Sequence, residues 1–274
     1  MNTLKILVFA PTYYPQMGGG ERSMYELYSR LPSLGINVDL ITPNLGGKEF
    51  EEPVTGFKIY RVGKKRKNLI AKFLLNQLAQ YNKAKQLIKE NDYYLVHNQF
   101  VLPNGIVSYL ISREIHKPLI TSEHHYGTGR DISSPEDNPK FVNPIIRFIF
   151  RKSDLIITTG LTQDNYLRWH FGAYPKNAIA IRLGSPDIKS IPEEQKLNIK
   201  EKLGYSNKKI VFSIGRITTR KYFNEMISAA QIVCEKIPNV LFIIAGKGED
   251  LECLRKEVID RKLDSSVKFI GFVD

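Results

Sequence analysis

Short apolar segments alternate with amphipathic segments along almost the whole chain, and this alternation constrains the fold more than any other feature. Residues 4–10 form a nearly continuous apolar run, typical of a strand buried on both faces. Residues 21–34 carry apolar side chains at helical spacing, and Gly35 ends that segment before a second apolar run at 38–42. Strand, helix and strand in such close succession predict a parallel βαβ unit.

The alternation continues through the first two thirds of the chain. We expect helices over 69–89, 105–115, 144–151 and 162–171, and strands over 94–97, 119–122, 155–159 and 178–182. This pattern predicts a doubly wound α/β domain. The polar, proline-bearing stretch 184–194 indicates a linker, so we expect domains over residues 1–185 and 186–274.

The second domain shows the same alternation of strands and helices over fewer residues. We expect strands over 209–214, 240–245 and 267–270, with helices over 222–234 and 250–262. Three strands make about half of a usual doubly wound sheet, so one sheet edge should lack its neighbour. We therefore expect an incomplete second domain that self-associates or is completed by a further segment or subunit.

The chain is basic, with a formal net charge of +12, and this favours an anionic partner. Its first apolar run is too short for a signal peptide, and no stretch approaches the ~18 apolar residues of a membrane span. Both cysteines, Cys234 and Cys253, fall in expected helices, which argues against a disulfide framework. These features predict a cytoplasmic protein.

Residues 63–89 contain eight basic residues and no acidic one, with apolar residues at helical spacing. Such a stretch suits an anionic membrane surface, so we expect peripheral attachment at the inner face of the membrane. The alternative is an ordinary helix that packs its apolar side on the sheet. Nucleic acid is not an expected partner, because stacking aromatic side chains do not alternate with these charges.

Gly18, Gly19 and Gly20 follow the first strand and precede the first helix, where a backbone can approach a phosphate. They do not form the dinucleotide fingerprint, because Ser23 stands where its third glycine would be. The alternative is a plain turn without a ligand.

Histidines follow two of the expected strands: His97 ends one, and His124 with His125 follows another. Because parallel strands end at one edge of a sheet, these imidazoles are candidates for hydrogen bonds to a ligand. A zinc site is less favoured, since no cysteine or carboxylate lies at ligand spacing. A purely structural role is the other alternative.

In the second domain, Gly215 and Arg216 follow a strand, and Lys221 leads into a helix. The arginine fork and the lysine charge could converge on a diphosphate, with Arg220 beside them. Solvated surface charge is the alternative.

These motifs together resemble family 4 of the retaining, nucleotide-sugar-dependent glycosyltransferases, which have the GT-B fold of two Rossmann-like domains. Residues 15–22, Pro-Gln-Met-Gly-Gly-Gly-Glu-Arg, resemble the family's Pro-x-x-Gly-Gly-x-Glu-Arg opening. Residues 153–158 are similar to the last long strand of its first domain, and Gly215, Arg216 and Lys221 match its Gly-Arg-x4-Lys motif. Residues 241–248 and 267–273 resemble the next two strands.

The resemblance implies a hexosyl-type glycosyltransferase that moves a sugar, with retention, to a polysaccharide or lipid-linked acceptor. The donor's pyrophosphate would contact Arg216, Lys221 and the backbone of Gly18 and Gly19 in the interdomain cleft, without a metal or resident cofactor. His124 would be the catalytic-site histidine that contacts the sugar, with His125 as the alternative. The residues expected on the acceptor side are His97, His125 and Arg130.

The sequence departs from the family in three places. Asp187 stands in an altered Asn-Gly-Val-Asp motif, and Tyr222 replaces the glycine that usually follows the motif lysine. The family's Glu-x7-Glu motif, which holds the donor sugar and ribose, is expected beyond residue 274. Glu249 and Glu257 have that spacing but lie one strand too early, so we expect them on the surface. A catalytically inactive binding protein is therefore the alternative function.

Overall fold

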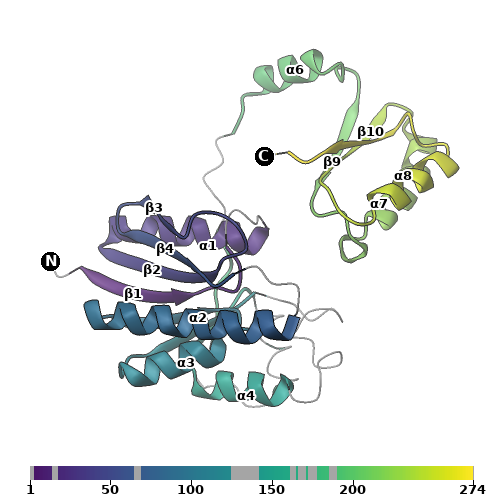
Figure 1. Ribbon diagram of the computed structural model, residues 1–274. Coiled ribbons are helices and arrows are strands. Elements are labelled where there is room, and N and C mark those ends of the chain that lie inside the picture. Colours follow the sequence, from purple (N-terminus) through teal and green to yellow (C-terminus); the bar gives the residue numbers. More distant parts are fainter. Residues whose placement is uncertain are drawn as a thin grey trace. The chain divides into compact units, whose positions relative to one another are not determined.

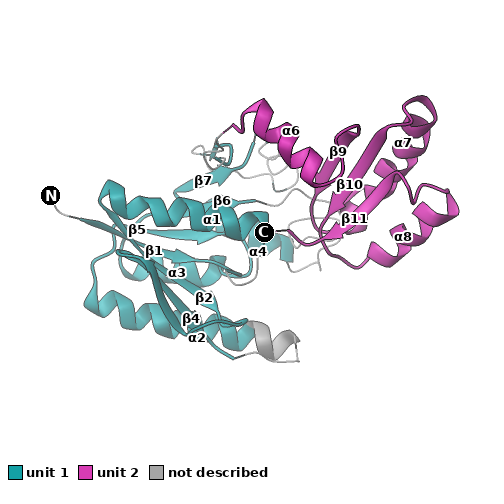
Figure 2. Cartoon of the chain, turned by 90° about the horizontal axis from the view of Figure 1, so that it is seen from above, with its two compact units in different colours: residues 1–187 teal, residues 188–274 magenta. Residues whose placement is uncertain are grey.

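In the computed structural model the chain forms two compact units, residues 1–187 and 188–274 (Figure 2). The structure describes residues 3–13, 18–64, 69–124, 142–160, 165, 171, 178–184 and 190–273, with backbone only for 69–73. The domain boundary predicted after residue 185 lies outside the described residues, as does most of the helix predicted over 162–171.

Unit 1 is built on an eight-stranded sheet with the order β3-β4-β2-β1-β5-β6-β7-β8 (Figure 1). Neighbouring strands run parallel, except that β3 is antiparallel to β4. The strands are β1 (Leu4–Phe9), β2 (Ile36–Pro43), β3 (Phe50–Val54), β4 (Phe57–Val62), β5 (Leu95–Gln99), β6 (Leu119–Glu123), β7 (Leu155–Thr158) and β8 (Ala178–Ala180). The helices are α1 (Gly19–Arg30), the short 3-10 helix η1 (Leu31–Leu34), α2 (Leu69–Glu90), α3 (Gly105–Glu114) and α4 (Val142–Lys152).

Strand β1 is buried on both faces because helices cover both sides of the sheet. Val8 packs with Met24 and Tyr28 of α1, whereas Phe9 packs with Ile111 of α3 on the opposite face. Helices α2, α3 and α4 lie side by side on that second face (Figure 1). The predicted doubly wound arrangement is confirmed.

The hairpin of β3 and β4 was not predicted from the sequence. Strand β3 contains Glu51, Glu52 and Pro53 and is largely exposed, so it lacks the apolar run of an interior strand. Gly56 makes the turn with a φ of +88°, a conformation that favours glycine. Charge and proline are typical of edge strands, which explains why this segment does not look like a strand in the sequence.

Unit 2 is a three-stranded parallel sheet with the order β11-β10-β9. The elements are α6 (Glu193–Lys202), β9 (Lys209–Ile214), the short 3-10 helix η2 (Thr219–Lys221), α7 (Phe223–Lys236), β10 (Val240–Ala245), α8 (Leu251–Asp260) and β11 (Val267–Gly271). Strand β10 is buried throughout. Helix α6 was not predicted, because its residues are exposed or half-buried and show no apolar face.

Strand β9 forms one edge of this sheet within the described part of the chain. It pairs with β10 on one side, and Val211, Phe212 and Ile214 are exposed. An exposed apolar edge is a template for pairing with another strand. Self-association or completion at this edge stays a prediction.

Within the residues that the structure describes, no helix is both long enough and apolar enough to cross a membrane.

Candidate functional site

The glycine loop of unit 1 lies at the start of helix α1, at the carboxyl end of β1. Gly18 is the N-cap in an extended conformation and contributes no side-chain cap. A Cβ added to Gly19 would meet nothing within 4 Å among the described residues, so their packing does not require glycine there. A helix N-terminus favours an anion, which is the role predicted for this loop. The Glu21 carboxylate also lies at this end, 2.6 Å from the position of a Cβ added to Gly18, so phosphate binding here stays a prediction.

His124 lies directly after β6, and several groups hold it from inside the unit. The carboxylate of Glu123 accepts hydrogen bonds from the backbone N–H groups of His124 and Val101, both at 3.0 Å. The His124 ring packs on Phe100, with 4.9 Å between ring centroids, and its Nε2 lies 2.6 Å from Oε1 of Gln99. The ring is therefore fixed at the carboxyl edge of the sheet.

Phe100 connects the glycine loop to the histidine. It adopts a φ of +65° directly after β5, and its ring lies 3.2 Å from the position of a Cβ added to Gly20. The same ring packs on His124. The structure thus brings the two predicted parts of the unit 1 site together at one sheet edge.

His97 is 8% exposed and lies behind this edge in a hydrogen-bond network. Its Nδ1 lies 3.1 Å from Oη of Tyr28, and its Nε2 lies 2.8 Å from Oγ of Ser122. Burial, and secondarily His124, lowers the pKa of His97 to about 3. A neutral ring with both nitrogens engaged suits an internal support, and contact of His97 with an acceptor stays a prediction.

We predict that His97 makes stability depend on pH. An unfolded histidine titrates near pH 6.5, so between about pH 6.5 and 3 the unfolded chain binds a proton that the folded chain excludes. Acidification below about pH 6.5 should lower the free energy of unfolding by up to about 1.4 kcal/mol per pH unit. Urea unfolding at several pH values should show a shallower dependence for His97→Gln than for the wild type. His116→Gln, at an exposed position, is the control, and equal slopes in all three proteins would contradict the prediction.

His125 and Arg130, predicted for the acceptor side, lie outside the described residues. Asp187, in the altered motif, also lies outside them.

In unit 2, the loop from Gly215 to Lys221 connects the end of β9 to the N-terminus of α7. Arg216 and Lys221 are both exposed on it. Tyr222, with a φ of +53°, turns the chain into the helix. Two exposed cations beside a helix N-terminus form a favourable arrangement for a diphosphate.

A second loop, directly after β10, holds the cationic loop in place. The N–H of Ile217 donates to the carbonyl of Lys247 at 3.0 Å, and Thr219 Oγ1 donates to Asp250 Oδ2 at 2.8 Å. A Cβ added to Gly248 would lie 1.9 Å from the Ile217 carbonyl oxygen. Glycine at position 248 therefore allows the two backbones to approach this closely.

Glu249 and Glu257 do not form a paired site. Glu249 is exposed in the loop before α8, whereas Glu257 lies on α8 and pairs with Arg261 at 2.8 Å. Among the described residues, no three histidine, cysteine or acidic side chains lie together as metal ligands would.

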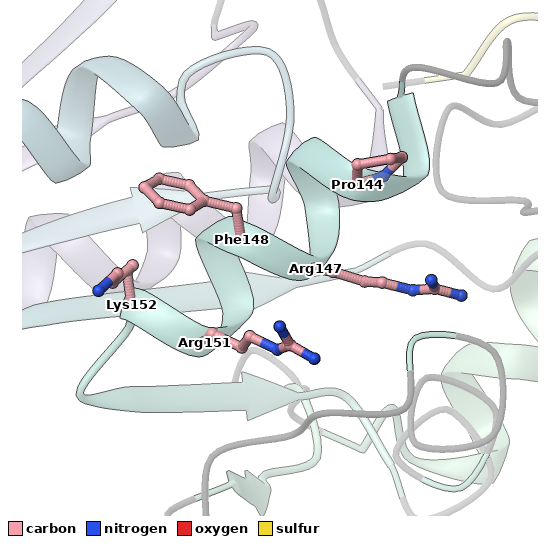
Figure 3. Close-up of a pocket in the computed structure, with 5 residues that line it drawn as sticks. All are labelled: Pro144, Arg147, Phe148, Arg151 and Lys152. Carbon is pink, nitrogen blue, oxygen red and sulfur yellow. The ribbon is translucent and has the colours of Figure 1, made fainter.

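A cavity of about 460 Å³ lies on helix α4 (Figure 3). Its lining includes three cations: Arg147, Arg151 and Lys152. Figure 3 shows Arg147 and Arg151 on one side of the helix, with Phe148 and Lys152 on the other. The described residues of the lining include no acidic one, so this part of the surface favours an anionic partner.

Comparison with known proteins identifies the family. The model described as Glycosyltransferase Family 4 matches residues 17–184, and the one described as Glycosyl transferases group 1 matches residues 194–274. The chain belongs to glycosyltransferase family 4.

Two relatives show how much of a family 4 protein this chain represents. Mannosylfructose-phosphate synthase of Agrobacterium fabrum is 24% identical over 94% of this chain and 60% of its own length. Alpha-monoglucosyldiacylglycerol synthase of Streptococcus pneumoniae is 22% identical over 98% of this chain and 62% of its own length. The chain therefore spans about 60% of these two glycosyltransferase relatives.

Solved structures confirm the GT-B fold class. Sucrose-phosphate synthase from Thermosynechococcus elongatus has a TM-score of 0.78 at 16% identity, covering 99% of this chain and 71% of that one. HepE of Anabaena in complex with UDP-glucose has a TM-score of 0.72 at 19% identity, covering 99% and 70%. The fold is that of two Rossmann-like domains, the second smaller.

Several residues of the candidate site were not predicted from the sequence. Gln99 and Phe100 support His124, and Gly248 and Asp250 hold the cationic loop. One signal was present for Gln99, because it lies two residues after His97 and therefore on the same face of its strand. A Gly-x-Gly sequence directly after the strand at 240–245 similarly marked a close backbone approach.

Proposed function

We propose that the protein is a retaining glycosyltransferase that moves a sugar from a nucleoside diphosphate sugar to a polysaccharide or lipid-linked acceptor. The cationic loop of Arg216 and Lys221 at the start of α7, held by the Gly248 loop, carries this proposal. Its charges would stabilise the leaving diphosphate without a metal, since they lie where negative charge develops. The complex of HepE with UDP-glucose supports a nucleotide sugar as donor.

The remaining roles follow from this assignment. The backbone of Gly18 and Gly19 would approach the donor phosphates, and His124 would contact the donor sugar. The leaving phosphate would assist deprotonation of the acceptor hydroxyl on the same face of the sugar, which gives retention. His125 and Arg130 stay predicted contacts of the acceptor.

Calorimetric titration with UDP, UMP and uridine, and with the guanosine series, tests the donor site. We expect the diphosphate to bind more tightly than the monophosphate, and the nucleoside most weakly, with affinity falling as salt rises. Equal affinity within a series, or no binding in either, would refute the assignment.

The glycine loop allows a separate test of the backbone approach. Because no described atom lies within 4 Å of a Cβ on Gly19, Gly19→Ala should not destabilise the fold, and it should raise the free energy of unfolding by about 0.4 to 1 kcal/mol because the unfolded chain loses freedom. If the donor diphosphate lies against this backbone, the added methyl should weaken its binding by about 1 to 3 kcal/mol. Calorimetry and urea unfolding of the variant decide this, with Gly160→Ala, another open position, as control. Undiminished affinity would place the donor away from the loop.

We also propose that unit 1 attaches to the cytoplasmic face of an anionic membrane through α2 and α4. On α2, Leu74 is 60% exposed and Leu78 is 53% exposed, whereas Asn76 and Gln80 are buried. The leucine side chains of α2 therefore face solvent while the amides are buried. The resulting apolar surface lies on the side of the sheet that also carries the cations of α4 (Figure 1). Lys64 before the helix is exposed, and Lys65, Arg66 and Lys67 lie outside the described residues.

Vesicle sedimentation tests this attachment. Replacing both Leu74 and Leu78 with Ser should weaken binding to anionic vesicles by about 2 kcal/mol or more, because their apolar surface no longer enters the lipid. Leu27→Ser with Leu34→Ser is the matched control, since both are exposed at or beside α1 on the opposite face. Equal losses in both double variants, or equal binding to neutral and anionic vesicles, would exclude the proposed surface.

A further inference from the structure

A chain of hydrogen bonds runs inward from His124. Oε1 of Gln99 lies 2.6 Å from Nε2 of His124, and the amide nitrogen of Gln99 donates to Oη of Tyr28 at 2.5 Å. Tyr28 in turn lies 3.1 Å from Nδ1 of His97, whose Nε2 lies 2.8 Å from Oγ of Ser122. Four side chains thus stand in series behind the ring of His124.

These supporting groups are sealed from solvent. Gln99 is 1% exposed, and Tyr28 is fully buried. A buried polar group that loses its partner has no water to replace it, so each member holds its neighbour in place. The series is therefore a rigid support.

The series also has a direction. The amide oxygen of Gln99 can only accept, so Nε2 of His124 must donate to it. The amide nitrogen of Gln99 donates to Oη of Tyr28 and also lies 3.3 Å from Nε2 of His97. Burial keeps His97 neutral by lowering its pKa, so Nε2 of His97 can accept from this amide.

We propose that Gln99 is the positioning residue of His124, holding the ring in one orientation with its proton on Nε2. The role of His124 toward a donor sugar rests on the proposed function, whereas the position of the proton is a property of the protein alone. In this form Nδ1 of a neutral His124 accepts hydrogen bonds.

Histidine nitrogen NMR on the ¹⁵N-labelled chain tests the proposal without any ligand. His124→Gln assigns the signals of His124, which are then recorded at a pH where the ring is neutral. We expect the Nε2–H form in the wild type and a mixture of both tautomers in Gln99→Leu. Gln99→Glu keeps an accepting oxygen and should restore the Nε2–H form. The Nδ1–H form in the wild type, or an unchanged spectrum in Gln99→Leu, would overturn the proposal.

Matched variants separate a specific effect of Gln99 on His124 from the general effect of losing a buried hydrogen bond. Gln80→Leu removes another buried amide, which donates to Asn104, and Tyr93→Phe removes another buried hydroxyl, which donates to Asp39. Neither should alter the His124 signals. Tyr28→Phe removes the acceptor of the Gln99 amide and should therefore allow the Nδ1–H form of His124 alongside the Nε2–H form. This variant tests the proposal if Gln99→Leu does not fold. A wild type with the expected tautomer that binds no nucleotide would refute the proposed function and leave the positioning role standing.

Discussion

Gly248→Ala is expected to destabilise unit 2 by about 3 kcal/mol, the upper end for overpacking a close contact. The added Cβ would lie 1.9 Å from the carbonyl oxygen of Ile217 and 2.7 Å from its nitrogen. These are backbone atoms, so the loop carrying Arg216 would have to move. Binding of nucleoside diphosphate should fall with it.

Gly215→Ala is the matched control on the facing loop. The nearest atom to a Cβ there is 3.8 Å away, in Phe223. Replacing a glycine with alanine without strain is expected to stabilise the folded state by about 0.4 to 1 kcal/mol, because the unfolded chain loses conformational entropy. Urea unfolding of both variants measures the contrast. Similar stabilities for the two would show that the loops do not pack as described.

Replacing Arg216 or Lys221 with Ala is expected to weaken nucleoside diphosphate binding by about 1 to 3 kcal/mol each, the range for a lost charge-assisted hydrogen bond. Both side chains are exposed on the loop before α7, so their removal should leave the fold intact. Calorimetry with UDP and GDP measures the loss, and circular dichroism confirms folding.

Lys236→Ala is a suitable control for charge alone, since it lies in the last turn of α7, at the other end of the helix. It removes the same charge as Lys221→Ala, and its effect on binding should be small and screened by salt. Unchanged affinity in both Arg216→Ala and Lys221→Ala would contradict the donor site. A loss in Lys236→Ala as large as in Lys221→Ala would indicate a diffuse charge effect instead.

The interior of the fold could be predicted from the sequence because buried strands and amphipathic helices leave strong patterns. Residues 4–10 and 240–245 are nearly uninterrupted apolar runs, and both form buried strands. The exposed elements could not be predicted in the same way. Strand β3 carries charges and a proline, and helix α6 has no apolar face, so neither has a periodic pattern.

The candidate site could be predicted only where its residues sit in short motifs. Gly18 to Gly20 and Gly215 to Lys221 each connect a strand to a helix, and the structure shows both in that setting. The supporting contacts join residues far apart in the sequence. Gln99 meets His124 and Thr219 meets Asp250, and no local spacing encodes such pairs.

Donor turnover tests the central claim most directly. Phosphorus NMR can follow UDP-glucose, GDP-mannose and other nucleotide sugars incubated with the purified chain and with a version extended by a complete family C-terminal region. We predict that nucleoside diphosphate accumulates from at least one donor with the extended version, that the 274-residue chain releases little or none, and that Arg216→Ala with Lys221→Ala abolishes release by the extended version. Donors that all stay intact with the extended version, or equal release by its double variant, would contradict the account.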